Sequence, residues 1–364
     1  MTDKDYMERA IALAKKGIGW TNPNPLVGAV IVKDGRIIGE GYHHKYGEKH
    51  AERDAIANLS ESAEGATIYV TLEPCCHFGK QPPCTYAIVE NKISRVIIGS
   101  RDPNPLVSGK GTEYLRANGV EVIEDFMRHE CDELNPVFFH YITTKMPYVV
   151  MKYAMTMDGK IATRTGASKW ITGERAREYV HEERCRYSAI MAGIGTILKD
   201  DPMLNVRGIE GAHQPLRVII DSNISIPMDS AIVRTSKEYP TVVACNHVVD
   251  EAKADMLKAF GISIIETPDS EGHVDIKKVM KWLADNKYDS VYIEGGGRIH
   301  EAALSSGVVN HASVYIAPKI FGGADAKSPV EGLGVETPDF ATMFELKEVK
   351  RLDDDILLSY DVRK

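Results

Sequence analysis

The amino-acid sequence predicts an α/β protein with two domains. Three observations support this: a length of 364 residues, β-rich runs that alternate with amphipathic helical runs, and a restart of that alternation near Lys145–Pro147. Strands alternating with helices build layered structures with a partly parallel sheet, and a domain usually holds about 100–200 residues. We therefore expect one domain over residues 1–145 and a second over residues 146–364, each long enough to bury its own core.

The elements of the first domain can be assigned in chain order. The run GAVIVKDGRIIGEGY holds two strands around Asp34-Gly35, a pair typical of a hairpin turn. Further strands are expected at residues 65–74 and 93–103, and a helix that stops at Gly119 should precede another strand. The expected helices are residues 7–16, 51–59 and 85–92.

The second domain repeats the alternation after Pro147. A strand is expected to begin after Pro147, and further strands are expected at residues 187–198, 216–222, 241–246, 262–267, 289–296, 312–320 and 356–363. Helical runs such as GERAREYVHEERCR and IKKVMKWLADN lie between them. Because the last strands, after Gly307, follow without intervening helices, we expect the sheet to end in an antiparallel edge or hairpin.

Composition excludes several classes of protein. The formal net charge is −8, from 44 basic and 52 acidic side chains, which argues against nucleic acid or an anionic membrane as the main partner. No run approaches the ~18 apolar residues of a membrane span, and the N-terminus lacks the apolar core of a signal peptide. These observations predict a cytoplasmic protein and do not argue against a small phosphorylated ligand. Six cysteines in 364 residues do not make a disulfide framework, so a local cluster points to metal or catalysis.

A metal site is predicted where a histidine and two cysteines come together in the motifs HAE and TLEPCCHFGKQPPC. His50, Cys75 and Cys84 are ligands that suit a catalytic zinc, with a fourth position left for water. Zinc lowers the pKa of that water to about 7. Glu52 follows His50 by two residues, the spacing at which the glutamate of zinc deaminases moves protons instead of binding metal.

The sequence leaves open other ligands and other kinds of site. Cys76 and His77 are rival ligands, but Cys75 directly follows Pro74 at a strand end, which suits a rigidly held ligand. The cysteine spacing also departs from the P-C-x-x-C form, because eight residues separate Cys75 from Cys84. The same residues could instead form a closed structural zinc site or be ordinary buried side chains. The glutamate at its offset favours catalysis.

The second domain holds a candidate cofactor turn. IEGGGRIHEAAL ends a strand, passes Gly295, Gly296 and Gly297, and starts a helix, so backbone N–H groups are free to bind a pyrophosphate. The run is not G-x-G-x-x-G, which disfavours a Rossmann domain. A tight turn without a ligand is the alternative.

Longer motifs carry a resemblance to a known family. PNPLVGAVIV, HAE, TLEPCCHFGKQPPC and RDPNPLVSGKG resemble the deaminase half of the bifunctional riboflavin-biosynthesis deaminase–reductases. MKYAMTMDGKIAT, SKWITGE, GIGTILKDDPMLNVR and VYIEGGG resemble the reductase half. The resemblance implies a cytidine-deaminase-like domain followed by a dihydrofolate-reductase-like domain. It also implies Zn²⁺ and NADPH as cofactors, a small phosphorylated pyrimidine as substrate, and a dimer or tetramer.

The resemblance further implies roles for individual residues. In the deaminase half, the substrate contacts would be Asn24, His43 and Lys80. In the reductase half, the cofactor contacts would be Ala154, Trp170, Thr196, Asp200, Ser222 and Gly295 to Gly297. The substrate contacts there would be Lys152, Ser168, Thr172, Arg184, Leu204, Arg207 and Glu294, with Arg184 and Arg207 on the phosphate. Ordinary alternatives are a turn cap for Asn24 and Asp200, a solvated loop charge for Lys80, and packing for Trp170.

Two rival functions fit parts of the sequence. One is a tRNA or free-base deaminase fused to a pteridine reductase, which matches the zinc motif but not the cysteine spacing or the acidic charge. The other is a non-catalytic, zinc-stabilised binding protein, which the intact Glu52 disfavours.

Overall fold

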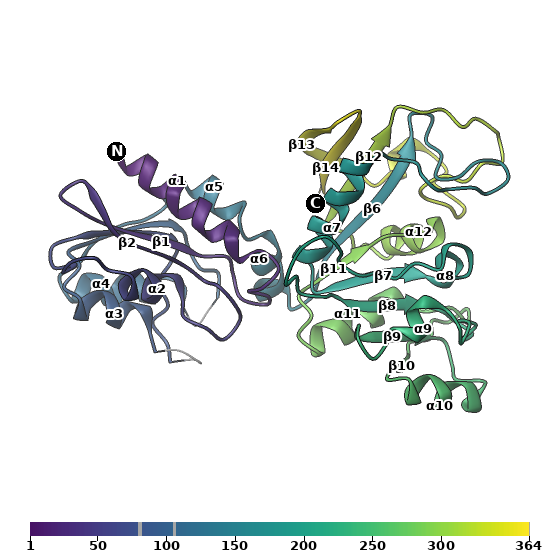
Figure 1. Ribbon diagram of the computed structural model, residues 1–364, viewed down its shortest axis with the longest axis horizontal. Helices are drawn as coiled ribbons and strands as arrows, with labels where there is room; N and C mark the ends of the chain where they lie inside the picture. Colours follow the sequence, from purple (N-terminus) through teal and green to yellow (C-terminus); the bar gives the residue numbers. More distant parts are fainter. Residues whose placement is uncertain (79–81, 105–106, 364) are drawn as a thin grey trace. The chain divides into compact units, whose positions relative to one another are not determined.

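The computed structural model describes residues 1–78, 82–104 and 107–363. The chain divides into two compact units, Met1–Lys145 and Met146–Lys364, coloured purple to blue and teal to yellow in Figure 1. Each unit is a layered α/β structure, so the predicted fold class is confirmed. None of the helices in the described ranges combines the length and apolar character that a membrane crossing needs.

The first unit is built on a five-stranded sheet in the order β2-β1-β3-β4-β5. β1 pairs antiparallel with β2 and β3, whereas β3, β4 and β5 run parallel. The strands are β1 (Gly28–Lys33), β2 (Arg36–Tyr42), β3 (Thr67–Leu72), β4 (Arg95–Ser100) and β5 (Glu121–Ile123). The helices are α1 (Asp3–Ala14), η1 (Lys15–Gly17), α2 (Ala51–Ala57), α3 (Cys84–Glu90), α4 (Lys110–Ala117), α5 (Arg128–Asp132) and α6 (Pro136–Thr144).

Apolar side chains lie on both faces of this sheet because successive residues of a strand point to opposite sides. One face packs against α1 and α5, with Met7 and Val30 in the buried cluster. The other packs against α2, α3 and α4 through Ala55, Ile88 and Leu115. Because β3 and β4 are parallel, the segments that follow them leave the sheet at the same edge, where ligands of α/β proteins usually bind.

The second unit is built on a nine-stranded sheet in the order β10-β9-β8-β7-β11-β6-β12-β14-β13. Its strands are β6 (Tyr148–Thr156), β7 (Ala189–Gly193), β8 (Leu216–Ile220), β9 (Thr241–Cys245), β10 (Ser263–Glu266), β11 (Ser290–Ile293), β12 (His311–Ala317), β13 (Phe344–Leu352) and β14 (Asp355–Val362). Its helices are α7 (Glu174–Arg186), α8 (Ile194–Asp200), α9 (Ala231–Arg234), α10 (Glu251–Ala259), α11 (Ile276–Asp285), α12 (Gly297–Ser305) and η2 (Pro338–Phe340).

The strands from β10 to β12 are parallel, and β14 and β13 add antiparallel to that edge. The expected antiparallel end of the sheet is therefore confirmed. α11 shows why its sequence forms a helix: Asp275 caps its first turn by accepting from the amides of Lys277 and Lys278. Val279 and Leu283, four residues apart, then face the core.

Four elements differ from the sequence-based expectation. The strand expected at residues 187–198 ends at Gly193, and a helix takes over at Ile194, because apolar periodicity cannot separate a short strand from a buried helix. β13 was not predicted, since most of its side chains are exposed and many are charged. α5 and α6 were also not predicted; α6 is rich in aromatic and β-branched residues, which are weak helix formers.

Candidate functional site

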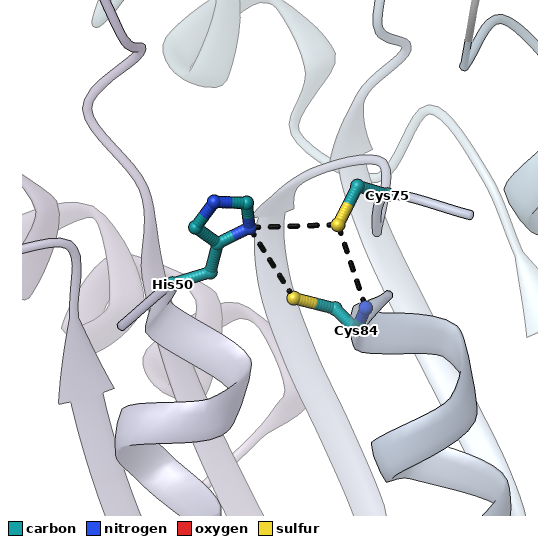
Figure 2. Close-up of side chains that lie close together, drawn as sticks. All are labelled: His50, Cys75 and Cys84. Carbon is teal, nitrogen blue, oxygen red and sulfur yellow. Dashed lines mark hydrogen bonds between the residues drawn. The ribbon is translucent and has the colours of Figure 1, made fainter. Parts of the chain in front are cut away.

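The first unit brings its three predicted metal ligands together at the ends of three elements. His50 is the residue before α2, Cys75 follows β3 and Pro74, and Cys84 is the first residue of α3. The Nδ1 atom of His50 lies 3.4 Å from each of the two sulfur atoms (Figure 2). All three ligand atoms lie within 4.8 Å of one another. A nitrogen and two sulfurs at this spacing fit zinc.

Electrostatics prepare this cluster for a cation. Hydrogen bonding from Cys84, followed by that from His50, lowers the pKa of Cys75. The lowered pKa favours the thiolate form of Cys75, which is the form that binds metal. The position of Cys84 at the start of α3 adds the positive end of the helix dipole.

Glu52 lies in the first turn of α2 and is buried, with 3% of its surface exposed. Burial, and secondarily the charge of Cys75, raises the pKa of its carboxyl group. A raised pKa brings a carboxyl group closer to neutral pH, which suits a general acid or base.

These residues line one pocket of about 260 Å³. Its wall includes His50, Glu52 and Cys75, so the metal cluster is open to a ligand on this side. The described part of the chain therefore does not form a sealed four-ligand cage. Asn24 and His43 lie in the same wall. Lys80 lies outside the described residues.

Asn24 and His43 form a short relay in this wall. His43 Nδ1 lies 2.9 Å from the carbonyl oxygen of Lys49, and its Nε2 lies 3.1 Å from Asn24 Nδ2. Since a carbonyl oxygen only accepts, Nδ1 carries the proton and Nε2 accepts from the amide of Asn24. Burial lowers the pKa of His43, which favours this neutral form. His43 therefore contacts Asn24 directly, as well as lining the pocket.

The pocket contains residues that the sequence analysis did not single out. Asp102, Asn104 and Val107 follow β4 and line it. Burial raises the pKa of Asp102 to about 6, and its carboxylate accepts from the backbone N–H of Asn104. The position after a parallel strand that neighbours β3 was a usable signal, because the two segments leave the sheet at one edge.

In the second unit, a buried ion pair joins two of the predicted substrate residues. Glu294, directly after β11, accepts from Arg184 of α7 through both carboxylate oxygens, with an Nη2–Oε2 distance of 2.8 Å. Although burial raises the pKa of Glu294, the charge of Arg184 outweighs it and lowers that pKa to about 2. Lys152 of β6 is nearby, and burial lowers the pKa of its ammonium group. The predicted phosphate contact Arg184 is thus already paired with Glu294.

Leu204 and Arg207 lie on the segment between α8 and β8. Leu204 is buried with a φ of 47°, and Arg207 is exposed. The backbone N–H of Arg207 donates to His181 Nδ1. Burial, together with the charges of Arg184 and Arg207, lowers the pKa of His181 to about 4. A neutral histidine beside an exposed guanidinium leaves Arg207 available to an anion.

The glycine turn before α12 lies against the turn before α8. The backbone N–H of Gly193 donates to the carbonyl of Gly295. A Cβ atom placed on Gly296 would meet only Thr196 Oγ1, at 3.8 Å, and one on Gly195 would meet nothing within 4 Å. A Cβ atom placed on Gly297, the first residue of α12, would instead meet the side chain of Glu331 at 2.6 Å. Open space therefore lies beside Gly195 and Gly296, where a helix N-terminus suits a pyrophosphate-bearing cofactor.

The remaining predicted residues fall into two groups. Ser168 Oγ donates to Asp200 Oδ1 at 3.4 Å, and the exposed Trp170 is covered by the guanidinium of Arg177, 4.6 Å from its ring centre. Thr172, in the same segment, is buried and its carbonyl accepts from Arg177. The other two are placed by strands: Ala154 is on β6 and Ser222 follows β8.

A metal cluster open to a pocket, and a mostly parallel sheet with a glycine turn, define the class of each unit. The first unit has the architecture of a zinc-dependent deaminase, and the second has that of a nucleotide-dependent reductase. Residues 1–100 match the cytidine and deoxycytidylate deaminase zinc-binding region. Residues 147–358 match the RibD C-terminal domain.

The chain belongs to the RibD family of riboflavin biosynthesis proteins. It is 52% identical over 363 residues to riboflavin biosynthesis protein RibD of Actinobacillus pleuropneumoniae, covering 100% of this chain and 96% of the relative. It is 41% identical to RibD of Aquifex aeolicus, with 98% of each chain covered. The resemblance found in the sequence motifs is therefore confirmed, as are Zn²⁺ and NADPH as the cofactors.

A solved structure has a similar fold along nearly all of the chain. The Thermotoga maritima protein is a diaminohydroxyphosphoribosylaminopyrimidine deaminase/5-amino-6-(5-phosphoribosylamino)uracil reductase. It superposes with a TM-score of 0.87 at 37% identity, covering 99% of this chain and 98% of that one.

Proposed function

We propose that this chain catalyses two consecutive steps on one phosphorylated pyrimidine. In the first, 2,5-diamino-6-ribosylamino-4(3H)-pyrimidinone 5′-phosphate loses its ring 2-amino group as ammonia. In the second, NADPH reduces the ribosyl chain to ribityl, which gives 5-amino-6-ribitylaminouracil 5′-phosphate. The two activities named for the Thermotoga maritima relative support this proposal. We assign the first step to residues 1–145 and the second to residues 146–364.

The observation that carries the deaminase assignment is the pocket shared by Glu52 and the metal cluster. A zinc ion held by His50, Cys75 and Cys84 would supply a water molecule that is nucleophilic at neutral pH. Glu52 accepts the proton that this attack releases and delivers it to the departing nitrogen. Burial raises the pKa of Glu52, which suits a group that must both take and give a proton.

Asn24 orients the ring in this assignment. His43 fixes which end of the Asn24 side-chain amide is the NH₂ group and which is the oxygen. The donor and acceptor of this amide are therefore already in place when it meets the ring edge. A preorganised amide favours a ring whose edge carries the complementary pair of groups.

In the reductase half, NADPH supplies the hydride that adds to C1′ of the ring-opened ribosylamine. We assign Lys152 and Glu294 to the sugar chain, because they follow the paired residues Met151 and Ile293 of neighbouring strands, and the charge of each affects the pKa of the other. Lys152 donates to a sugar oxygen and polarises it. Glu294, held by Arg184, accepts from a sugar hydroxyl group. Arg207 binds the phosphate group.

A two-step product assay tests the proposal. Purified protein is given the phosphorylated pyrimidinone, cytidine or adenosine, and ammonia is measured. Release from the pyrimidinone alone supports the assignment, whereas release from cytidine or adenosine alone supports the rival free-base or tRNA deaminase. NADPH oxidation is then followed with and without the deaminated product. Oxidation that is indifferent to that product would reject the reductase assignment.

We also propose that the chain forms homo-oligomers, as a dimer or a tetramer. Leu346 and Val349 on β13 and Ile356 on β14 share one face of the terminal hairpin and are exposed. Exposed apolar side chains on an edge strand favour pairing with another protein surface. Sedimentation equilibrium of the intact chain and of Val349→Glu tests this, with a monomeric intact chain as the contrary outcome.

The thiol ligands favour a reducing, cytoplasmic location.

A further inference from the structure

The segment from Met203 to Arg207 is held by side chains instead of by a backbone ladder. Every backbone polar group that is buried needs a partner. Here the carbonyl of Met203 accepts from Arg217 Nη1 at 3.1 Å, and the carbonyl of Asn205 accepts from Arg184 Nη1 at 2.8 Å. The position of this segment therefore depends on individual side chains that a substitution can remove.

The middle of the segment is clamped in a second way. Gln214 accepts from the backbone N–H of Val206 at 2.8 Å and donates to the carbonyl of the same residue at 3.0 Å. Next to it, Leu204 has a left-handed backbone with a φ of 47°. Leucine seldom adopts this conformation, and it persists only where the surroundings enforce it. The segment is thus held in a conformation that it would not choose alone.

Arg217 is the most unusual of these clamps. It lies on β8, its side chain is fully buried, and burial lowers the pKa of its guanidinium to about 10. At neutral pH it is therefore a buried cation. The hydrogen bonds of its guanidinium end on uncharged oxygen atoms, which are Thr241 Oγ1, Thr235 Oγ1 and the carbonyl oxygens of Met203, Ile232 and Tyr239.

A buried cation of this kind is a poor way to gain stability. Removing a charge from water is costly, and apolar side chains of similar volume often stabilise as well or better. What an arginine adds is a planar set of donors that joins several backbone segments at fixed angles. Arg217 joins the strand β8, the helix α9 and the segment before Arg207 in this way.

We propose that Arg217 is a positioning residue of the reductase, with Gln214 as a second clamp on the same segment. The two side chains fix the segment whose end carries Arg207, so that its guanidinium meets the phosphate group of the substrate. This inference rests on the proposed function of Arg207. Arg217 itself touches no substrate, because its side chain is fully buried and its donors are engaged within the protein.

Steady-state kinetics of the full chain test this role. In Arg217→Met we expect the reductase KM for the phosphorylated, deaminated substrate to rise about 10-fold, while kcat changes less than about twofold, since only binding geometry is lost. The unphosphorylated analogue should show no change. Gln214→Leu should also raise the KM for the phosphorylated substrate, and it replaces Arg217→Met in this test if Arg217→Met does not fold. Deamination by the first unit provides an internal control for both.

Thr235→Val is the matched control for Arg217. It removes an acceptor of the same guanidinium, Thr235 Oγ1 at 2.9 Å, but leaves the bond to Met203 intact. We expect its KM to equal that of the unmodified chain. Equal KM increases for the phosphorylated and unphosphorylated substrates in Arg217→Met, or a KM increase in Thr235→Val, would overturn the positioning role.

A double-mutant cycle with Arg207→Ala separates the two proposals. If Arg217 acts through Arg207, then adding Arg217→Met to Arg207→Ala should raise KM no further. Additive KM increases would overturn the inference. If Arg207→Ala alone leaves KM unchanged, the phosphate assignment of Arg207 fails. If Arg207→Ala raises KM but Arg217→Met and Gln214→Leu do not, the assignment stands and the positioning role fails.

Discussion

The metal cluster of the first unit and the ion pair of the second bury polar groups in opposite ways. His50, Cys75 and Cys84 turn three ligand atoms toward one point, and a cation is the partner that their chemistry requires. Arg184 and Glu294 instead satisfy each other within the chain. The activity of the first site therefore depends on a bound metal ion, whereas the second site depends on ion pairing and packing within the chain.

Removing the metal should give the largest difference between the activities of the two sites. We expect a chelator to abolish ammonia release, because the metal is the group that makes water nucleophilic at neutral pH, while NADPH oxidation with the deaminated substrate continues. Measuring both rates on one sample before and after dialysis, and after adding zinc back, checks this. Full deamination by protein that contains no metal would contradict it.

Glu52→Gln should remove one function of the first site and leave the metal in place. We expect deamination to fall by about 10³-fold, since general acid–base catalysis typically contributes 10²–10⁴-fold. Zinc content and NADPH oxidation should be unchanged. Ammonia release and metal analysis provide the measurement, and Glu130→Gln, an exposed glutamate of the same unit, is the control. An unaltered deamination rate in Glu52→Gln would refute the role of this carboxyl group.

Arg184→Met should show that the second site depends on its own packing. The substitution leaves Glu294 buried without its partner, and we expect the second unit to lose roughly 3–5 kcal/mol of unfolding free energy. Reductase activity should fall with it, while deamination persists. Denaturant unfolding is the measurement. Arg175→Met removes an exposed ion pair on the same helix and should lower the unfolding free energy only slightly. A similar loss of unfolding free energy in both variants would show that the pair of Arg184 and Glu294 has no special importance for packing.

The pH dependence of unfolding should sharpen the same contrast with a smaller effect. The pKa of Glu294 is lowered from 4.5 to about 2 in the folded chain. The stability that this carboxylate contributes is therefore fully present above pH 4.5 and is lost as the pH falls toward about 2. We expect Arg184→Met to flatten the loss of stability of the second unit over this range. If unfolding of the unmodified chain and of Arg184→Met depended on pH in the same way, the ion pair between Arg184 and Glu294 would not be the source of this stability.

The first site was largely predictable because its chemistry lies in short motifs. His50 and Glu52 are two residues apart, and Cys75 follows a strand that β propensity reveals. Asp102 was not predicted as a site residue, although it lies in the motif RDPNPLVSGKG, because the motif does not show which of its side chains faces the pocket. Only the pairing of β4 beside β3 brings it to the pocket, and strand order is a property of the whole sheet.

The second site was less predictable because its residues come from distant elements. Arg184 and Glu294 are 110 positions apart, and no local pattern could pair them. Resemblance supplied both residues but not their ion pair, so both arginines were expected on the phosphate. Arg217 gave no signal either, since an arginine within an apolar strand does not show where its hydrogen bonds will go.

The relay from Lys49 through His43 to Asn24 has a consequence for substrate selection. The carbonyl of Lys49 determines which imidazole nitrogen bears hydrogen, and that in turn determines which end of the carboxamide is nitrogen. A main-chain atom, which no side-chain substitution can alter, therefore sets the polarity of this part of the wall. Under the role proposed for Asn24, the pocket would discriminate between tautomers of one heterocycle, which have the same size and shape and differ only in the location of a hydrogen atom.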